Sequence, residues 1–265
     1  MQTKIRVGAV SYLNTKPLIF GFNNPITQET IDLVIDYPSK IASMLLENQV
    51  DVGLVPVAII PEMPEYHIIS DYCIGSDGEV ASVCLFSEVP LQNIETILLD
   101  YQSRTSVELL KVLAKEFWKI NPIFKETSGE YQQQVSGSTA ALVIGDRALQ
   151  QRKISPYIYD LGAAWKKFTG LPFVFAAWVS NKKLSEDFIN AFNEANALGL
   201  NRIEQIISEN PFDAFDLSKY YTQYISYNLD ENKKQGLKLF LHKLREQYSF
   251  KLNYENNNFT SQIIK

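Results

Sequence analysis

The chain has 265 residues, which is enough for one large domain or two smaller lobes around a sizeable core. Its formal net charge of −5 leaves no basic field of the kind that binds nucleic acid. Histidine and cysteine occur only twice each, at spacings that fit no metal or redox motif, so we expect no metal site and no catalysis that needs a histidine.

The N-terminal stretch lacks a signal-peptide pattern, because Ser11, Asn14 and Lys16 interrupt its apolar residues. No later segment is long and apolar enough to cross a membrane. We therefore expect a soluble cytoplasmic protein that binds neither membrane nor nucleic acid.

The first eighty residues alternate predicted strands with short predicted helices. Pro17 fits the first turn of one helix, and Ser39 is the expected N-cap of another. This alternation predicts parallel strand pairing with right-handed crossovers. The predicted strands cover residues 4–10, 31–38, 50–56 and 66–75.

Two long apolar segments, 79–90 and 171–180, flank a second block of the same character. Between them the pattern predicts a helix over 105–118 and strands over 95–100, 140–146 and 157–162. From residue 185 onward the chain reads as mostly helical, and Asp230 is the expected N-cap of the last helix.

We interpret the two long apolar segments as hinge strands that connect two lobes. Lobe one then comprises residues 1–85 and 178–265, with both termini, and lobe two comprises residues 86–177. The predicted fold class is α/β with two lobes, and a substrate cleft lies between them.

Several polar clusters follow predicted strands, where open α/β sheets bind their ligands. Ser11 and Asn14 follow the first strand, Ser103 to Ser106 follow residues 95–100, and Asp146 follows residues 140–144. Thr169 and Gly170 precede the second apolar segment.

Each cluster also has a purely structural explanation. Thr105 and Glu108 have capping-box spacing, although free N–H groups at the same helix start would also attract an anion. Ser82 lies in an apolar predicted strand, where its hydroxyl needs a partner that is most often backbone. Asp146 and Arg147 form a local ion pair in the structural reading.

Motifs of one known family occur in the right order over nearly the whole chain. They are VGAVSYLNTKPL, QVDVGLVPVA, SVCLFS, LLDYQSRTSVELL, LVIGDRAL and DLGAAWKKFTGLPFVFAAW. Together these stretches resemble the chorismate dehydratases of the futalosine route to menaquinone. Gln49, where the family often has glycine, is a small departure at an expected helix end.

This resemblance implies a type II periplasmic-binding-protein-like fold that removes water from chorismate to give 3-[(1-carboxyvinyl)oxy]benzoate. It carries catalytic roles to Asn14 and Ser82 and implies no metal or organic cofactor. The expected partner is a small dianionic substrate, and the protein is a monomer or homodimer. The expected substrate contacts are Ser11, Ser103, Thr105, Ser106, Asp146, Thr169 and Gly170.

The carried-over motifs contain no histidine or carboxylate at the catalytic positions. Our hypothesis is that the side-chain carboxylate of the substrate takes the proton while Asn14 and Ser82 orient the substrate, with Asp146 as the alternative acid or base. Two other functions remain open. They are a 1,4-dihydroxy-6-naphthoate synthase of the same pathway and a non-catalytic anion-binding protein.

Overall fold

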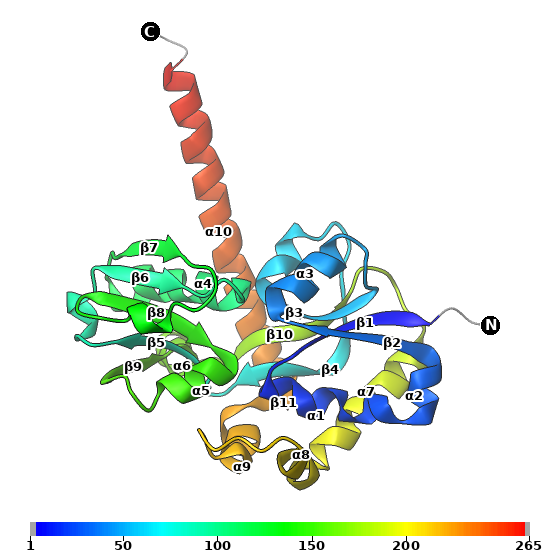
Figure 1. The fold of residues 1–265 in the computed structure, drawn as a ribbon. Coiled ribbons are helices and arrows are strands. Elements are labelled where there is room, and N and C mark those ends of the chain that lie inside the picture. The colour runs from blue at the N-terminus through cyan, green and yellow to red at the C-terminus, as the bar shows by residue number, and fades with distance from the viewer. Residues whose placement is uncertain (1–3, 263–265) are drawn as a thin grey trace.

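The computed structural model describes residues 4–262 and, within that range, the side chains of all residues except 25–26 and 247–262. Two separate sheets form two lobes, as the sequence predicts (Figure 1). Among the described residues, no helix combines the length and the apolar character that a membrane span requires.

Lobe one is built on a six-stranded sheet with the order β11-β4-β10-β3-β1-β2. β1 pairs in parallel with β2 and β3, whereas β10 runs antiparallel to both β3 and β4. The strands are β1 (Ile5–Val10), β2 (Ile31–Asp36), β3 (Val52–Pro56), β4 (His67–Ser76), β10 (Phe173–Ser180) and β11 (Ser226–Asn228).

Lobe two contains a five-stranded sheet with the order β7-β6-β8-β5-β9. β6 is parallel to β7 and β8, and β5 is antiparallel to β8 and β9. The strands are β5 (Val83–Ser87), β6 (Thr96–Leu99), β7 (Ile123–Glu126), β8 (Thr139–Ile144) and β9 (Tyr157–Asp160).

Helices flank both sheets, and α10 runs from lobe one past lobe two (Figure 1). Lobe one carries α1 (Lys16–Ile19), α2 (Pro25–Thr30), α3 (Pro38–Leu46), α7 (Glu186–Leu200), α8 (Ile203–Glu209), α9 (Leu217–Lys219) and α10 (Glu231–Gln262). Lobe two carries α4 (Arg104–Val112), α5 (Gly145–Gln151) and α6 (Leu161–Thr169). Short 3-10 helices include η1 (Leu13–Thr15) and η3 (Val57–Glu62), and two π-helical turns are η5 (Leu113–Trp118) and η7 (Tyr220–Tyr224).

The chain changes lobes at positions that differ from the predicted hinge strands. The first crossing is the segment 77–82, between β4 and β5. It ends in a tight turn, in which Ala81 has a φ of +61° and the Ser82 N–H donates to the Val80 carbonyl at 2.7 Å. This tight turn delays the strand until Val83, so β5 belongs wholly to lobe two. β10 pairs with β3 and β4 along its length and therefore belongs wholly to lobe one.

Helix caps also differ from two sequence-based expectations. Ser103, not Thr105, caps α4, since its Oγ accepts the Ser106 N–H at 3.1 Å. α3 has Tyr37 at its N-cap, with Pro38 rather than Ser39 opening the helix. The prediction for Asp230 is confirmed, because its carboxylate accepts the Lys233 N–H at 2.9 Å.

In the core of lobe one, α7 packs against β10 and against α1. The rings of Trp178 and Phe192 meet edge to face at 4.9 Å, and the Trp178 indole donates to Asn196 of α7 at 2.9 Å. At Gly199, a Cβ atom would overlap the carbonyl oxygen of Pro17. Glycine at this position therefore allows α7 to approach the chain that follows β1.

Gly199→Ala is expected to destabilise the protein. Helix propensity alone would favour alanine by up to about 1 kcal/mol, whereas backbone overlap with Pro17 should cost roughly 1–3 kcal/mol. Urea unfolding of this variant beside Glu194→Ala, on the exposed face of the same helix, measures the sign. A rise in stability for Gly199→Ala would contradict the packing argument.

Candidate functional site

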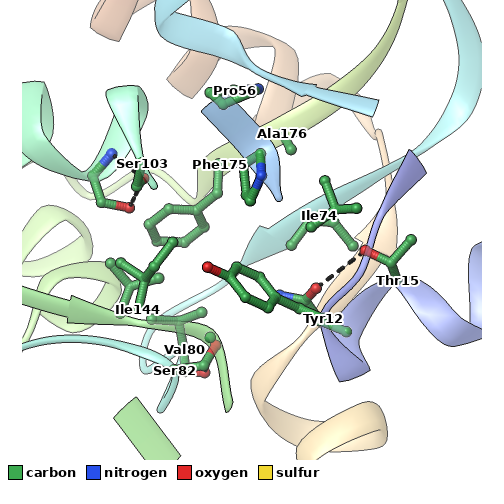
Figure 2. Close-up of a pocket in the computed structure, with 16 residues that line it drawn as sticks. Tyr12, Thr15, Pro56, Ile74, Val80, Ser82, Ser103, Ile144, Phe175 and Ala176 are labelled. Atoms are coloured by element: carbon green, nitrogen blue, oxygen red, sulfur yellow. Dashed lines mark hydrogen bonds between the residues drawn. The ribbon is translucent and has the colours of Figure 1, made fainter. Parts of the chain in front are cut away.

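A cavity lies between the two lobes, beyond the ends of β1, β3 and β8. Figure 2 shows side chains from both lobes turned toward this shared space. Its atom-free space is about 490 Å³, part of it open to solvent. The lining residues are Val10, Tyr12, Asn14, Thr15, Pro38, Pro56, Ile74, Val80, Ser82, Val83, Ser103, Ser106, Ile144, Gly145, Phe175 and Ala176.

The cavity is mostly apolar and offers neutral hydrogen-bonding groups. None of the described residues that line it carries a charged side chain. Its polar side chains are hydroxyls and one amide, from Tyr12, Asn14, Thr15, Ser82, Ser103 and Ser106. Such a site suits a small ligand with a largely apolar body that is oriented by a few polar contacts.

Asn14 and Ser82, the two predicted catalytic residues, both line the cavity. Asn14 lies in η1 directly after β1, and its side chain is almost fully buried. Ser82 is fully buried, and its backbone carbonyl accepts the Gly145 N–H at 2.8 Å. The structure therefore brings together two positions that are 68 residues apart in the sequence.

The turn that presents Ser82 is held by the carboxylate of Asp160. This carboxylate accepts the N–H groups of Val80 and Ala81, at 3.1 and 2.8 Å, and also caps α6 through Ala163. Burial raises the pKa of Asp160 in spite of these bonds. The left-handed backbone of Ala81 costs on the order of 1 kcal/mol or more, which the Asp160 contacts offset.

Ser103 and Ser106 form the N-terminal cap of α4 and also line the cavity. Their hydroxyls are 2.8 Å apart, both side chains are buried, and both line the cavity. The N-terminus of α4, a helix of nine residues, therefore faces the ligand space. Capping and ligand binding are compatible at this position.

Thr105 is turned away from the cavity and contacts the opposite lobe. Its Oγ accepts the N–H of Ala58 in η3 at 3.1 Å, and the side chain is buried. Beside it, Arg104 forms an ion pair with Glu62 of the same η3 segment at 3.1 Å. The residues that follow Ser103 therefore hold the lobes together.

Three other predicted substrate contacts do not line the cavity. Ser11 is exposed just after β1, where its N–H donates to the backbone carbonyl of Asp36 at 3.0 Å. The Thr169 hydroxyl donates to the Trp165 carbonyl at 2.9 Å, and Gly170 ends α6 with a φ of +76°. A helix C-terminus needs this arrangement, which explains the Thr-Gly pair without a ligand.

Asp146 also bridges the lobes and lies outside the cavity lining. Its carboxylate accepts the Leu13 N–H at 3.1 Å, so α5 of lobe two is fastened beside Asn14. Burial raises the pKa of Asp146 to about 6. The alternative of an Asp146–Arg147 ion pair is wrong, because Arg147 binds Asp100 at 2.9 Å.

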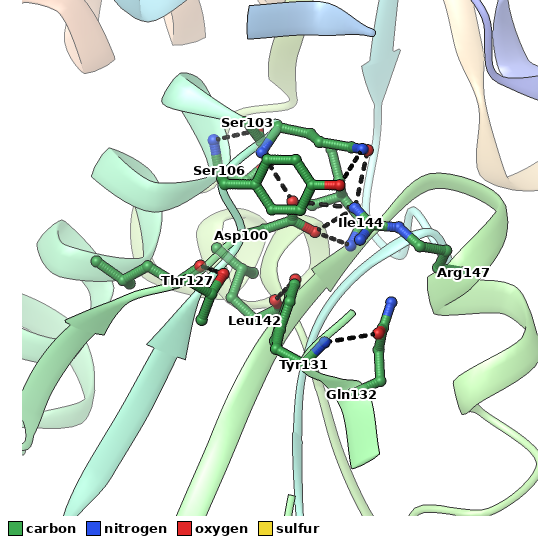
Figure 3. Close-up of polar contacts among 12 residues, drawn as sticks. Asp100, Ser103, Ser106, Thr127, Tyr131, Gln132, Leu142, Ile144 and Arg147 are labelled. Carbon is green, nitrogen blue, oxygen red and sulfur yellow. Dashed lines mark hydrogen bonds and ion pairs between the residues drawn. The ribbon is translucent and has the colours of Figure 1, made fainter. Parts of the chain in front are cut away.

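The Arg147–Asp100 pair belongs to a polar network behind the cavity, shown in Figure 3. Asp100 is fully buried and also accepts the N–H groups of Gln102 and Ile144, at 2.9 and 3.1 Å. The Gln102 amide oxygen accepts from Arg147 and from the Tyr12 hydroxyl of lobe one. These contacts neutralise the charges near the ligand space and connect its two walls.

The sequence analysis did not single out Tyr12 or the Asp100–Gln102–Arg147 network. Tyr12 could have been found from its place beside Asn14, but nothing local to Gln102 indicates its partners. Among the described residues, no three histidine, cysteine, aspartate or glutamate side chains gather as they would to hold a metal ion.

Solved structures of low sequence identity share the fold. Protein AF1704 from Archaeoglobus fulgidus superposes with a TM-score of 0.73 at 16% identity, covering 93% of this chain and 98% of that protein. The periplasmic aliphatic sulphonate binding protein SsuA from Escherichia coli gives 0.61 at 13% identity, covering 95% and 94%. The chain is therefore a two-lobed α/β protein of the periplasmic-binding-protein fold, and the predicted fold class is confirmed.

The sequence comparison identifies the family within that fold. A family model described as menaquinone biosynthesis matches residues 5–246, so the chain belongs to this menaquinone biosynthesis family. A chorismate dehydratase from Thermus thermophilus is 26% identical over 261 residues, covering 88% of this chain and 93% of that protein.

Asp146→Asn should flatten the dependence of stability on pH between about 4 and 6. The folded pKa of about 6 exceeds the ordinary value of 3.8, so the folded protein binds this proton more tightly than the unfolded chain does. The free energy of unfolding of the wild type therefore falls as pH rises through this window. The variant lacks this loss, so its stability relative to wild type should be higher at pH 7 than at pH 4 by on the order of 1–2 kcal/mol, allowing for solvent screening.

Urea unfolding at several pH values measures this effect. Asp32→Asn, at an exposed position of β2, is the control and should leave the pH dependence unchanged. An Asp146→Asn variant that keeps the wild-type slope between pH 4 and 6 would refute the buried carboxyl as its source.

Proposed function

We propose that this protein is a chorismate dehydratase, a carbon–oxygen lyase that converts chorismate to 3-[(1-carboxyvinyl)oxy]benzoate and water. The observation that carries the proposal is the uncharged cavity between the lobes, with Asn14 and Ser82 both in its lining. Membership in the menaquinone biosynthesis family and the likeness to the Thermus thermophilus enzyme support this reaction.

The dehydration loses a proton from the ring carbon that bears the enolpyruvyl ether and the hydroxyl from its neighbour. The electrons of the broken C–H bond enter the ring, the C–O bond to the hydroxyl breaks, and the departing hydroxide takes up a proton to become water. Since the ring becomes aromatic, the reaction has a large driving force and does not require a strong protein base.

We assign the proton transfer to the side-chain carboxylate of the substrate. The described lining residues include no aspartate, glutamate or histidine, so no base of these types borders the ligand space. Because no described lining residue is a cation, and the nearby Arg147 is paired with Asp100, desolvation raises the basicity of a bound carboxylate. The same carboxylate can then return the proton to the departing hydroxide.

Asn14 and Ser82 supply the remaining polar contacts in this scheme. They orient the substrate and donate hydrogen bonds where negative charge develops. A donor placed for the transition state contributes on the order of 3 kcal/mol, which is the scale expected for each residue. We assign a substrate carboxylate to Ser103 and Ser106, and their position in the cavity lining at the start of α4 supports this assignment.

Purified protein incubated with chorismate should form the aromatic product, followed by chromatography and mass. Ser82→Ala and Asn14→Ala should each lower kcat by about 10²–10³, because each removes a hydrogen-bonding group at the reacting ring. Ser208→Ala, at an exposed position on α8, is the matched control. Chorismate binding without turnover by the wild type would instead favour an anion-binding protein, and turnover of a cyclic futalosine derivative would favour the naphthoate synthase.

Asp146→Asn should keep kcat within about tenfold of wild type at pH 7. Asp146 lies outside the cavity lining, and asparagine can still accept the Leu13 N–H through its amide oxygen. Near-total loss of turnover together with a displaced pH–rate profile would assign the proton transfer to Asp146 and reject the substrate carboxylate as the base.

A further inference from the structure

Tyr220 contacts the proposed catalytic residue Ser82, although it comes from the C-terminal part of the chain. It opens the π-helical turn η7 and is fully buried. Its hydroxyl donates to Ser82 Oγ at 2.7 Å. A phenol of lobe one is therefore bonded to the segment that crosses between the lobes.

The direction of these bonds determines what Ser82 can do. A serine hydroxyl has one proton, and Tyr220 supplies its own proton to the Ser82 oxygen. The remaining contact of Ser82 is a long one, from Oγ to the Val80 carbonyl at 3.4 Å. The Ser82 proton is therefore available to a ligand in the cavity that Ser82 lines.

Tyr220 remains a proton donor across the physiological range, since burial raises the pKa of its hydroxyl well above the ordinary value. A second buried tyrosine supports the η1 segment, because the Tyr227 hydroxyl donates to the Asn14 backbone carbonyl at 3.0 Å. Hydrogen bonds in series polarise one another, so the bond from Tyr220 makes the Ser82 hydroxyl a better donor to a ligand.

We propose that Tyr220 is a positioning residue whose hydrogen bond to Ser82 Oγ directs the Ser82 proton toward the bound substrate. This inference rests on the proposed dehydratase function. The alternative is that Tyr220 only fills the core, where its ring packs against Phe215 and Tyr221 at centroid distances of 6.1 and 5.6 Å.

The neighbouring tyrosine offers a matched control. Tyr221 is also buried, and among the described residues its hydroxyl has no hydrogen-bond partner. Tyr220→Phe and Tyr221→Phe each remove one buried hydroxyl and keep the ring, from adjacent positions. We expect Tyr220→Phe to lower kcat about 10- to 100-fold with KM within about threefold, and Tyr221→Phe to leave both within about twofold.

A double variant separates positioning from packing. Because Tyr220 acts through Ser82, adding Tyr220→Phe to Ser82→Ala should lower kcat little further. Equal kcat values for Tyr220→Phe and wild type, or full additivity in the double variant, would overturn the inference. Thermal unfolding of all variants shows whether the losses reflect an unfolded protein.

An NMR readout makes this test independent of turnover. A buried tyrosine hydroxyl proton exchanges slowly, so wild type should show a resonance that Tyr220→Phe lacks and Ser82→Ala shifts. Wild-type protein that fails to convert chorismate would reject the proposed function, whereas a resonance unchanged in Ser82→Ala would reject the hydrogen bond from Tyr220 to Ser82.

Discussion

The carboxylate of Asp160 holds the point where the chain passes from one lobe to the other. It accepts the N–H groups of Val80 and Ala81 and so maintains a backbone turn that an alanine does not adopt readily. The residue after this turn is Ser82, and the strand that begins next is β5, which pairs with β8 and β9 in the lobe-two sheet. One buried carboxylate thereby sets both the connection between the lobes and the position of a cavity hydroxyl.

The site keeps formal charges out of contact with the ligand space while placing several of them close behind it. Asp100 and Arg147 neutralise each other at 2.9 Å, and the carboxyl of Asp146 is shifted toward its neutral form by burial. The walls of the cavity then present hydroxyls, an amide and apolar side chains. A charged ligand in such a space meets oriented dipoles in place of mobile water, which strengthens each polar contact.

The two lobes are in contact in this structure, through bonds that belong to neither sheet. Asp146 accepts from Leu13, Thr105 accepts from Ala58, and the Tyr12 hydroxyl donates to Gln102. These bonds connect the two walls of a cavity that is partly open to solvent. Residues that looked like ligand contacts in the sequence are in part residues that hold the lobes closed.

The sequence by itself determined most strands and the two-lobed organisation, because buried β-strands need continuous apolar runs and these are visible in one dimension. It did not indicate β7 or β11, nor the antiparallel pairing of β4. It also located Asn14, Ser82, Ser103 and Ser106, whose motifs could be matched to a family. It could not determine that Ala81 adopts a left-handed turn, that Thr105 turns to Ala58, or that Tyr220 reaches Ser82. Those contacts join residues 47 and 138 positions apart, and only the order of the strands and the closure of the lobes decide which side chains meet.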